Sequence, residues 1–457
     1  MINYNDLTKA NLYLREDLVG QLEKVSNKKF IFTYSDQWIK SNKGGLGLSL
    51  PTDKKKYESE ELLPFFDNLI PEGWLLSYAQ TFYHVDKKNR FGVLLATGRE
   101  TVGAVKVFGL DENGNEIKVS DEQKEKARES LTLTEVEFLP ANKRCPYCLK
   151  ELTEKQLQKI YFHQACSKRM WDTTRKIKIY LDSRDPLNSF RQTIYGASIS
   201  GAQRKGLFNF EKGILSPTYK KSQYIIKPQG DFPYLPENEH VTMAIAQSVG
   251  FDIPPFTIFN VENIGMVFAI KRFDLTTNGN QLRLEDFGQV LGIPSSDKYE
   301  ASYNKIAKAI KMYSDAPIAD LFELWKRLLF SFFIGNGDMH LKNWSLIELG
   351  SMKGIFKLSP CYDFLNTRLP IHDEEIDLGL TLNGKKHKVT KDLFVNFANE
   401  NKIGHLIDDV FSDLERWMKT TEDLVTDCYL PEESKERYLE VVKSRFNVLQ
   451  GNGRSYI

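Results

Sequence analysis

Residues 332–343 read FFIGNGDMHLKN and close an apolar segment whose spacing predicts a helix. Asp338 precedes Asn343 by five residues, and Asp363 comes after a short strand-like stretch, residues 354–358. Phosphoryl transfer from ATP needs two carboxylates and an amide at one site. One carboxylate meets the attacking hydroxyl, while an amide oxygen and a second carboxylate hold Mg²⁺ against the phosphates. The spacing Asp-x4-Asn also occurs in the catalytic loop of protein kinases, but it is common by chance, so its weight depends on the elements that precede it.

The composition indicates several domains and no feature of secretion or membrane insertion. The length of 457 residues suggests roughly three domains, and a net charge of +1 gives no reason to expect bulk nucleic-acid binding. No apolar run approaches the length of a membrane span, and residues 1–14 lack the apolar core of a signal peptide. Five cysteines in a chain of this size do not make a disulfide framework. We therefore expect a cytoplasmic protein with no membrane contact.

The hydrophobic pattern predicts an α+β fold in which a β-rich part precedes a helical part. Strands are expected at 12–22 (two, with a turn), 30–34, 46–51, 102–108, 206–210, 223–228 and in a hairpin over 255–274. Helices are expected at 62–82 (broken by Pro64 and Pro71), 121–130, 237–249, 303–312, 318–334, 391–399, 403–421 and 432–449. Two lobes in this order, with the Asp-x4-Asn loop in the second, predict a bilobal, protein-kinase-like layout. The expected units are a small β-rich subdomain (1–112), a connector (113–143), a Cys/His knuckle (144–172), an N-lobe (173–285) and an all-α C-lobe (286–457).

Four further elements stand in the order that a nucleotide site requires. Residues 198–206 include several small residues, which let backbone N–H groups approach and bind phosphates. An ordinary turn before a strand can have the same composition. Lys227 ends a strand and can reach the α- and β-phosphates, or it is a surface lysine. Glu239 or Glu237 on the following helix can pair with it, and we favour Glu239. Residues 271–274 close a strand where an adenine-binding hinge would lie.

A separate cysteine and histidine set has the spacing of a structural metal site. Cys145 and Cys148 are followed by His163 and Cys166, which is a Cys-x2-Cys and His-x2-Cys arrangement typical of tetrahedral Zn²⁺. The alternative is a cysteine pair in a turn with an unrelated buried histidine and cysteine. The two remaining cysteines, Cys361 and Cys428, are isolated and are expected to be packing residues.

These motifs together resemble the HipA family of bacterial toxin serine/threonine kinases. The resemblance is carried by residues 198–203, 205, 224–227, 238–239, 272–274, 294–299, 335–345 and 360–363, and near the N-terminus by 48–51, 65–72 and 98–105. It covers most of residues 10–385. The arrangement is similar to a small HipS-like N-terminal subdomain fused to a HipT-like kinase core. Met339 stands where the family's loop usually has glycine.

The resemblance implies a role for each matching residue. Asp338 would be the catalytic base, and Lys342 would neutralise negative charge on the transferred phosphoryl group. Asn343 and Asp363 would bind Mg²⁺. The ATP-binding residues would be Lys227, Ser200, Gly201, Ala202, Gln203, Lys205 and His340, with Phe273 and Asp274 at the adenine end. Ser198 and Ser200 would be autophosphorylation sites, where added charge beside the nucleotide would shut the enzyme off.

The resemblance also implies substrates and partners. The kinase would be the toxin of a toxin–antitoxin pair and would phosphorylate a protein of translation, such as an aminoacyl-tRNA synthetase. A HipB-like helix-turn-helix antitoxin would bind it and bring indirect contact with DNA. Three other functions stay open: a catalytically silent co-repressor that binds nucleotide and antitoxin, a zinc-knuckle nucleic-acid binder, and a small-molecule kinase.

Overall fold

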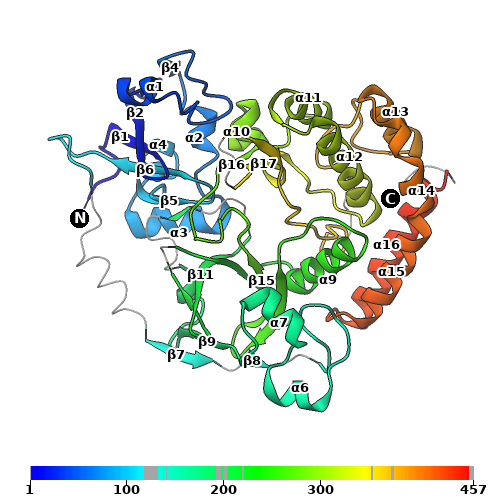
Figure 1. The fold of residues 1–457 in the computed structure, drawn as a ribbon. Coiled ribbons are helices and arrows are strands. Elements are labelled where there is room, and N and C mark those ends of the chain that lie inside the picture. The colour runs from blue at the N-terminus through cyan, green and yellow to red at the C-terminus, as the bar shows by residue number, and fades with distance from the viewer. Residues whose placement is uncertain are drawn as a thin grey trace.

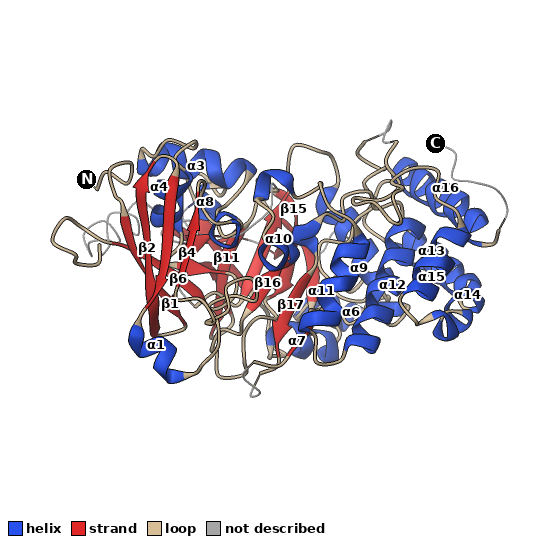
Figure 2. Ribbon diagram, turned by 90° about the horizontal axis from the view of Figure 1, so that it is seen from above, coloured by secondary structure: helices blue, strands red, loops and turns tan. Residues whose placement is uncertain are grey.

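The computed structural model describes residues 2–117, 132–136, 138–139, 142–191, 197–198, 203–218, 221–350, 354–371 and 375–451. Strands gather toward one end of the molecule and helices toward the other (Figure 2). The predicted α+β class is therefore confirmed, with the β-rich part first along the chain. None of the helices in the described ranges combines the length and the apolar character that a membrane span requires.

The N-terminal unit is a five-stranded sheet in the order β4-β3-β2-β1-β6, with antiparallel neighbours. Side chains of β1 alternate between buried and more exposed positions, as a sheet with one covered face requires. The elements are β1 (Lys9–Leu14), β2 (Asp17–Ser26), β3 (Lys29–Tyr34), α1 (Asp36–Ser41), β4 (Lys56–Ser59), α2 (Pro64–Asp67), α3 (Gly73–Tyr83), α4 (Arg90–Thr97), β5 (Glu100–Thr101) and β6 (Val105–Gly109). Pro64 is the first residue of α2, and Pro71 lies between α2 and α3, so the predicted helical region is broken into pieces at the two prolines.

Residues 46–51 do not form the predicted strand, and β4 takes its place in the sheet. Leu46 and Leu50 are buried, but they lie in a loop closed by a single bridge between Gly47 and Leu50. A Cβ atom added to Gly47 would lie 2.2 Å from the Phe65 ring. The alternation of apolar residues therefore serves the packing of this loop against α2, which a period of two cannot distinguish from a strand.

The middle unit is an eight-stranded sheet in the order β7-β9-β12-β11-β13-β15-β14-β8. Strands β7 and β8 are neighbours in sequence but pair with opposite edges, so the predicted connector (113–143) contributes two short strands to this sheet. The elements are β7 (Leu133–Val136), β8 (Phe138–Leu139), α6 (Glu154–Lys159), α7 (Gln164–Trp171), β9 (Lys178–Asp182), α8 (Asn188–Arg191), β10 (Ala197–Ser198), β11 (Gly206–Glu211), β12 (Ile214–Pro217), β13 (Tyr224–Pro228), α9 (Leu235–Ser248), β14 (Phe256–Val261) and β15 (Gly265–Lys271). The predicted helix over 121–130 lies outside the described residues.

The third unit is mainly helical and packs around α12 (Figure 1). Its elements are β16 (Leu284–Asp286), α10 (Phe287–Leu291), α11 (Tyr303–Tyr313), α12 (Pro317–Phe333), β17 (Ser345–Glu348), β18 (Phe356–Leu358), α13 (Lys391–Glu400), α14 (Asp408–Ser412), α15 (Leu414–Asp427), α16 (Glu432–Leu449) and 3₁₀ turns at Ser295–Asp297, Leu341–Asn343 and Gly404–Leu406. The single helix predicted over 403–421 is wrong. The segment begins with the 3₁₀ turn Gly404–Leu406 and then divides into α14 and α15 at Asp413, whose N–H is shared between the carbonyls of Asp409 and Val410 at 3.1 and 3.2 Å, as is common at helix ends.

Two features of the third unit bring the predicted catalytic residues together. Helix α12 ends at Phe333, and the chain turns two residues later at Gly335, whose φ of +74° favours glycine because a side chain is strained there. Strands β17 and β18 are antiparallel, and the Ser359 N–H donates to the Ser345 carbonyl at 2.9 Å. Because Asn343 lies just before β17 and Asp363 lies just after β18, the two residues meet at the same end of this ribbon.

Candidate active site

The loop after α12 holds Asp338 and Asn343 in a fixed relation. The Asn336 side-chain oxygen accepts from the Asp338 N–H at 3.0 Å, and the Asn343 Nδ2 donates to the Asp338 carbonyl at 2.9 Å. The second bond leaves the Asn343 amide oxygen available to a ligand. The Asp338 carboxylate accepts a hydrogen bond from the hydroxyl of Tyr299. The loop therefore presents a carboxylate and an amide oxygen five residues apart, as the sequence pattern predicts.

Met339 fits this loop without unusual backbone geometry. Met339 is buried and is absent from the residues with positive φ, so its position does not demand glycine. Its carbonyl accepts bonds from the Tyr303 hydroxyl at 2.9 Å and from the Trp344 indole at 3.3 Å. The backbone of Met339 instead packs closely against Gly379, where an added Cβ atom would lie 2.7 Å from it. Substitution of the usual glycine is thus accommodated by packing around the loop.

Lys227 joins two carboxylates from different units. Its Nζ atom lies 2.6 Å from Glu239 Oε1 on α9 and forms an ion pair with Asp363. This confirms the predicted preference for Glu239 over Glu237. Burial favours protonation of both carboxyls, and it raises the pKa of Glu239 to about 7. At Asp363 the attraction of Lys227 and Lys205 outweighs burial and holds the pKa at about 2, so Asp363 is anionic at neutral pH.

Asp363 also has an uncommon backbone conformation, with φ at +56°. Residues other than glycine in this region are strained by about 1–3 kcal/mol and cluster at functional sites. Its neighbour Tyr362 stacks on Phe273 with ring centroids 5.6 Å apart. The turn therefore aims the Asp363 carboxylate at Lys227 while the adjacent ring packs against the end of β15.

One pocket contains most of the predicted nucleotide-binding side chains. Its lining includes Lys205, Lys227, Phe273, His340, Asn343 and Asp363, together with apolar residues of β13 and β15. Burial lowers the pKa of Lys205 to about 8, so it remains largely cationic at neutral pH beside Lys227. Two cations and a Mg²⁺-type ligand pair at the same pocket suit a polyphosphate. Burial lowers the pKa of His340 to about 4, which leaves that imidazole neutral.

Asp274 lines the pocket, but its carboxylate is already bound within the protein. Arg272 donates to it through two nitrogens, at 2.9 and 2.6 Å, and the Gly103 N–H donates at 2.8 Å. Asp274 therefore joins the N-terminal unit to the end of β15, and the apolar residue Phe273 lines the same pocket.

Lys342 has a partner that sequence reasoning did not identify. Its Nζ atom lies 2.7 Å from Glu72 Oε1, and Lys298 Nζ lies 2.6 Å from Glu72 Oε2. The Ser295 hydroxyl donates to the same carboxylate at 2.6 Å. Residues 65–72 and 294–299 carried part of the family resemblance, and this was the available signal for their joint role. The predicted contact of Lys342 with the phosphoryl group stays a prediction.

Several predicted site residues cannot be placed. Ser200, Gly201 and Ala202 lie outside the described residues, as does the side chain of Ser198. Gln203 is described and half-buried but does not line the pocket.

Asp286, which the sequence analysis did not propose, does line the pocket, and burial raises the pKa of its carboxyl to about 6.

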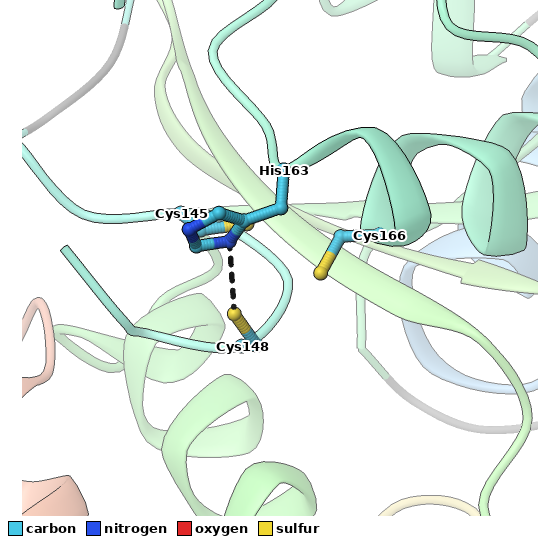
Figure 3. Close-up of side chains that lie close together, drawn as sticks. All are labelled: Cys145, Cys148, His163 and Cys166. Atoms are coloured by element: carbon cyan, nitrogen blue, oxygen red, sulfur yellow. Dashed lines mark hydrogen bonds between the residues drawn. The ribbon is translucent and has the colours of Figure 1, made fainter. Parts of the chain in front are cut away.

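The four residues of the predicted knuckle come together at a separate place (Figure 3). The ligand atoms of Cys145, Cys148, His163 and Cys166 all lie within 4.8 Å of one another. The alternative of an unrelated histidine and cysteine is therefore wrong. Cys361 and Cys428 are buried elsewhere, as expected for packing residues.

Comparisons with known proteins point to one family. Residues 197–428 match the HipA-like C-terminal domain, and residues 10–108 match the HipA N-terminal domain. A putative kinase of Sinorhizobium fredii, Y4dM, is 27% identical over 95% of this chain and 91% of its own length. The serine/threonine-protein kinase toxin HipA of Shewanella oneidensis is 23% identical over 78% of this chain and 74% of its own. The structure is similar to HipA in the solved Shewanella oneidensis complex of HipA, HipB and operator DNA, with a TM-score of 0.64, 19% identity and 97% of both chains covered.

Proposed function

The chain belongs to the HipA family of kinases, and from that membership we propose that it is the serine/threonine kinase toxin of a bacterial type II toxin–antitoxin system. ATP and Mg²⁺ would be its cosubstrate and cofactor. The observation that supports this proposal best is the pocket that joins Lys227, Asn343 and Asp363 beside the Asp338 loop. All four groups that phosphoryl transfer requires are present, which argues against a catalytically silent module.

The residues of the pocket fit a Mg²⁺–nucleotide complex. The anionic carboxylate of Asp363 and the amide oxygen of Asn343 are the hard oxygen ligands that Mg²⁺ prefers, and bound Mg²⁺ would offset charge on the phosphates. Lys227 and Lys205 would hold the phosphate oxygens. Asp338 would accept the proton of the attacking hydroxyl as the hydroxyl oxygen bonds to the γ-phosphorus of ATP, while the bond from that phosphorus to the bridging oxygen breaks and ADP leaves. The apolar surface near Phe273 would receive the adenine ring.

The substrate and partners follow from the family resemblance. We propose a translation protein, such as an aminoacyl-tRNA synthetase, as the phosphoryl acceptor, which would place the kinase in the cytoplasm. A HipB-like antitoxin with a helix-turn-helix would be the partner, since the relative from Shewanella oneidensis was solved with HipB and operator DNA. Any contact with DNA would be made through the antitoxin.

Incubation of the purified protein with Mg²⁺–ATP tests the kinase proposal. We expect the wild-type protein to gain a phosphoryl group that maps to Ser198 or Ser200, because these residues belong to the loop that precedes Lys205. The double variant Ser198→Ala/Ser200→Ala should lose that phosphate. Intact mass and site mapping give the readout, after removal of any phosphate acquired during expression. A wild-type protein that transfers no phosphate to itself or to candidate proteins would support the silent co-repressor instead.

The N-terminal unit is expected to stabilise the catalytic loop through Glu72. Burial favours the protonated form of this carboxyl, but Lys342 and Lys298 outweigh it and hold the pKa of Glu72 far below its usual value. Glu72→Gln leaves the buried Lys342 without its counter-charge, so it should lower the free energy of unfolding by about 3 kcal/mol. Chemical denaturation at neutral pH measures this loss, with the exposed Glu61→Gln as the matched control.

The pH dependence of this loss gives a second check. The folded-state pKa of Glu72 is lower than the unfolded one, so the stabilisation is complete above the unfolded value. It is lost as pH falls below that value. The stability difference between wild type and Glu72→Gln should therefore narrow below about pH 4. A stability difference that stays constant down to acid pH would show that the charge of the Glu72 carboxylate is not the source of the stabilisation.

A further inference from the structure

The Cys/His cluster has the geometry of ligands already oriented toward one point. Cys145 and Cys148 lie on a tight turn before α6, His163 directly precedes α7, and Cys166 lies in its first turn (Figure 3). His163 Nδ1 faces Cys148 Sγ at 3.4 Å, while its Nε2 lies 3.1 Å from the Glu151 carbonyl. A carbonyl can only accept, so Nε2 carries the hydrogen and the lone pair of Nδ1 points toward the cysteines. Metal-binding histidines are commonly oriented in this way.

The turn that carries the first two cysteines is built as a small closed unit. The Cys145 N–H donates to the Lys150 carbonyl at 2.9 Å, and the Leu152 N–H donates to the Lys143 carbonyl at 2.9 Å. Leu149, next to Cys148, has a φ of +60°, which tightens the turn. Three sulfur ligands and one imidazole form a donor set that is typical of structural Zn²⁺ and unsuited to Mg²⁺ or Ca²⁺.

The turn is also the contact point of three other elements. The Pro146 carbonyl, between the two cysteines, accepts from His240 Nε2 at 2.7 Å, Thr257 Oγ1 at 3.0 Å and the Ile258 N–H at 3.2 Å. His240 lies on α9, and Thr257 and Ile258 lie on β14. On the other side, Arg144 donates to Asp427 at the end of α15 at 2.7 Å. A well-placed turn thus links α9, β14 and α15.

We propose that Cys145, Cys148, His163 and Cys166 bind one Zn²⁺, and that this ion positions α9 and so places Glu239 against Lys227. His240 follows Glu239 directly in the chain, so a displaced Pro146 carbonyl would release the helix turn that carries Glu239. The zinc site stands on its own geometry, and its effect on Glu239 rests on the proposed kinase function. The ion is structural in this proposal, because all four positions of a tetrahedral site are filled by side chains.

Metal analysis of the full-length protein, purified without chelators, tests the site. We expect about one zinc per chain in the wild-type protein and near zero in Cys148→Ser and Cys166→Ser. The matched controls Cys361→Ser and Cys428→Ser remove buried cysteines outside the cluster and should keep the zinc. A metal-free wild-type protein, or zinc that persists in the double variant Cys148→Ser/Cys166→Ser, would overturn the proposal.

Two further measurements keep the test decisive if the variants fold poorly. Zinc-edge X-ray absorption of the wild-type protein should show three sulfur neighbours at about 2.3 Å and one nitrogen at about 2.0 Å; a shell of oxygen atoms would contradict the site. Hydrogen exchange in residues 235–248 should become roughly tenfold faster when zinc is removed, whereas α13 should not change. Unchanged exchange in α9 would refute its positioning by the ion. Neither readout needs turnover, so failure of the kinase proposal is distinguishable from failure of this one.

Discussion

Replacement of Asp338 by asparagine is expected to lower phosphoryl transfer by about 10²–10⁴-fold, the usual contribution of a general base. Asparagine has nearly the same shape and can still accept the hydrogen bond from Tyr299. Because the Asn336 and Asn343 contacts involve the backbone of residue 338, the loop should keep its structure. The loss would therefore report the proton-accepting role of the carboxylate. Turnover with a protein substrate, or self-phosphorylation followed by mass, measures it.

Asp297→Asn is the matched control for this experiment. Asp297 is exposed in the 3₁₀ turn at Ser295–Asp297, close in sequence to Tyr299, and has no proposed part in the chemistry. The Asp297→Asn substitution removes one negative charge, as Asp338→Asn does, at a residue close in sequence to Tyr299. Near wild-type turnover of Asp338→Asn would exclude Asp338 as the base. An equal loss in both variants would point to a general effect of charge near the loop.

The part of the site that could be predicted from sequence consists of residues close to one another along the chain. Asp338 and Asn343 share one loop, and Asp363 follows a short strand, so their spacing indicated the chemistry once it was read together with the elements that precede the loop. The ion pair of Lys227 with Glu239 was also predictable, because a strand end and the start of the next helix are near neighbours. In each case local pattern and chain order restricted the choice to one or two partners.

The contact of Glu72 with Lys342 could not be predicted in the same way. The two residues lie in different units, and many other charged residues of the chain were equally available as partners. Hydrophobic periodicity shows which face of an element is buried, but not which units dock. The same limit explains residues 46–51, where buried leucines on a loop have the alternation of a strand. Packing between distant parts of the chain, rather than local propensity, determines both the Glu72–Lys342 contact and the conformation of residues 46–51.

Asp363→Asn is expected to remove the dependence of nucleotide binding on Mg²⁺ and to lower turnover at least a hundredfold. The carboxylate is anionic at neutral pH because the pKa of Asp363 is held at about 2 by Lys227 and Lys205 against the effect of burial. A neutral amide is a weaker ligand for a hard cation. Loss of about 3 kcal/mol of charge stabilisation in the transition state corresponds to roughly this change in rate. Calorimetric titration of ATP with and without Mg²⁺ measures the binding effect.

Asp363 has two possible roles, as a metal ligand and as a partner of Lys227, and Glu239→Gln separates them. Glu239 lies 2.6 Å from the same lysine but has no proposed contact with the metal. If Asp363 binds Mg²⁺, then Glu239→Gln should weaken ATP binding while the affinity for ATP still increases with Mg²⁺, and Asp363→Asn should abolish that increase. Loss of the Mg²⁺ effect in Glu239→Gln alone would reverse the assignment. Equal loss in both variants would mean that the placement of Lys227, rather than a metal ligand, sets the Mg²⁺ dependence.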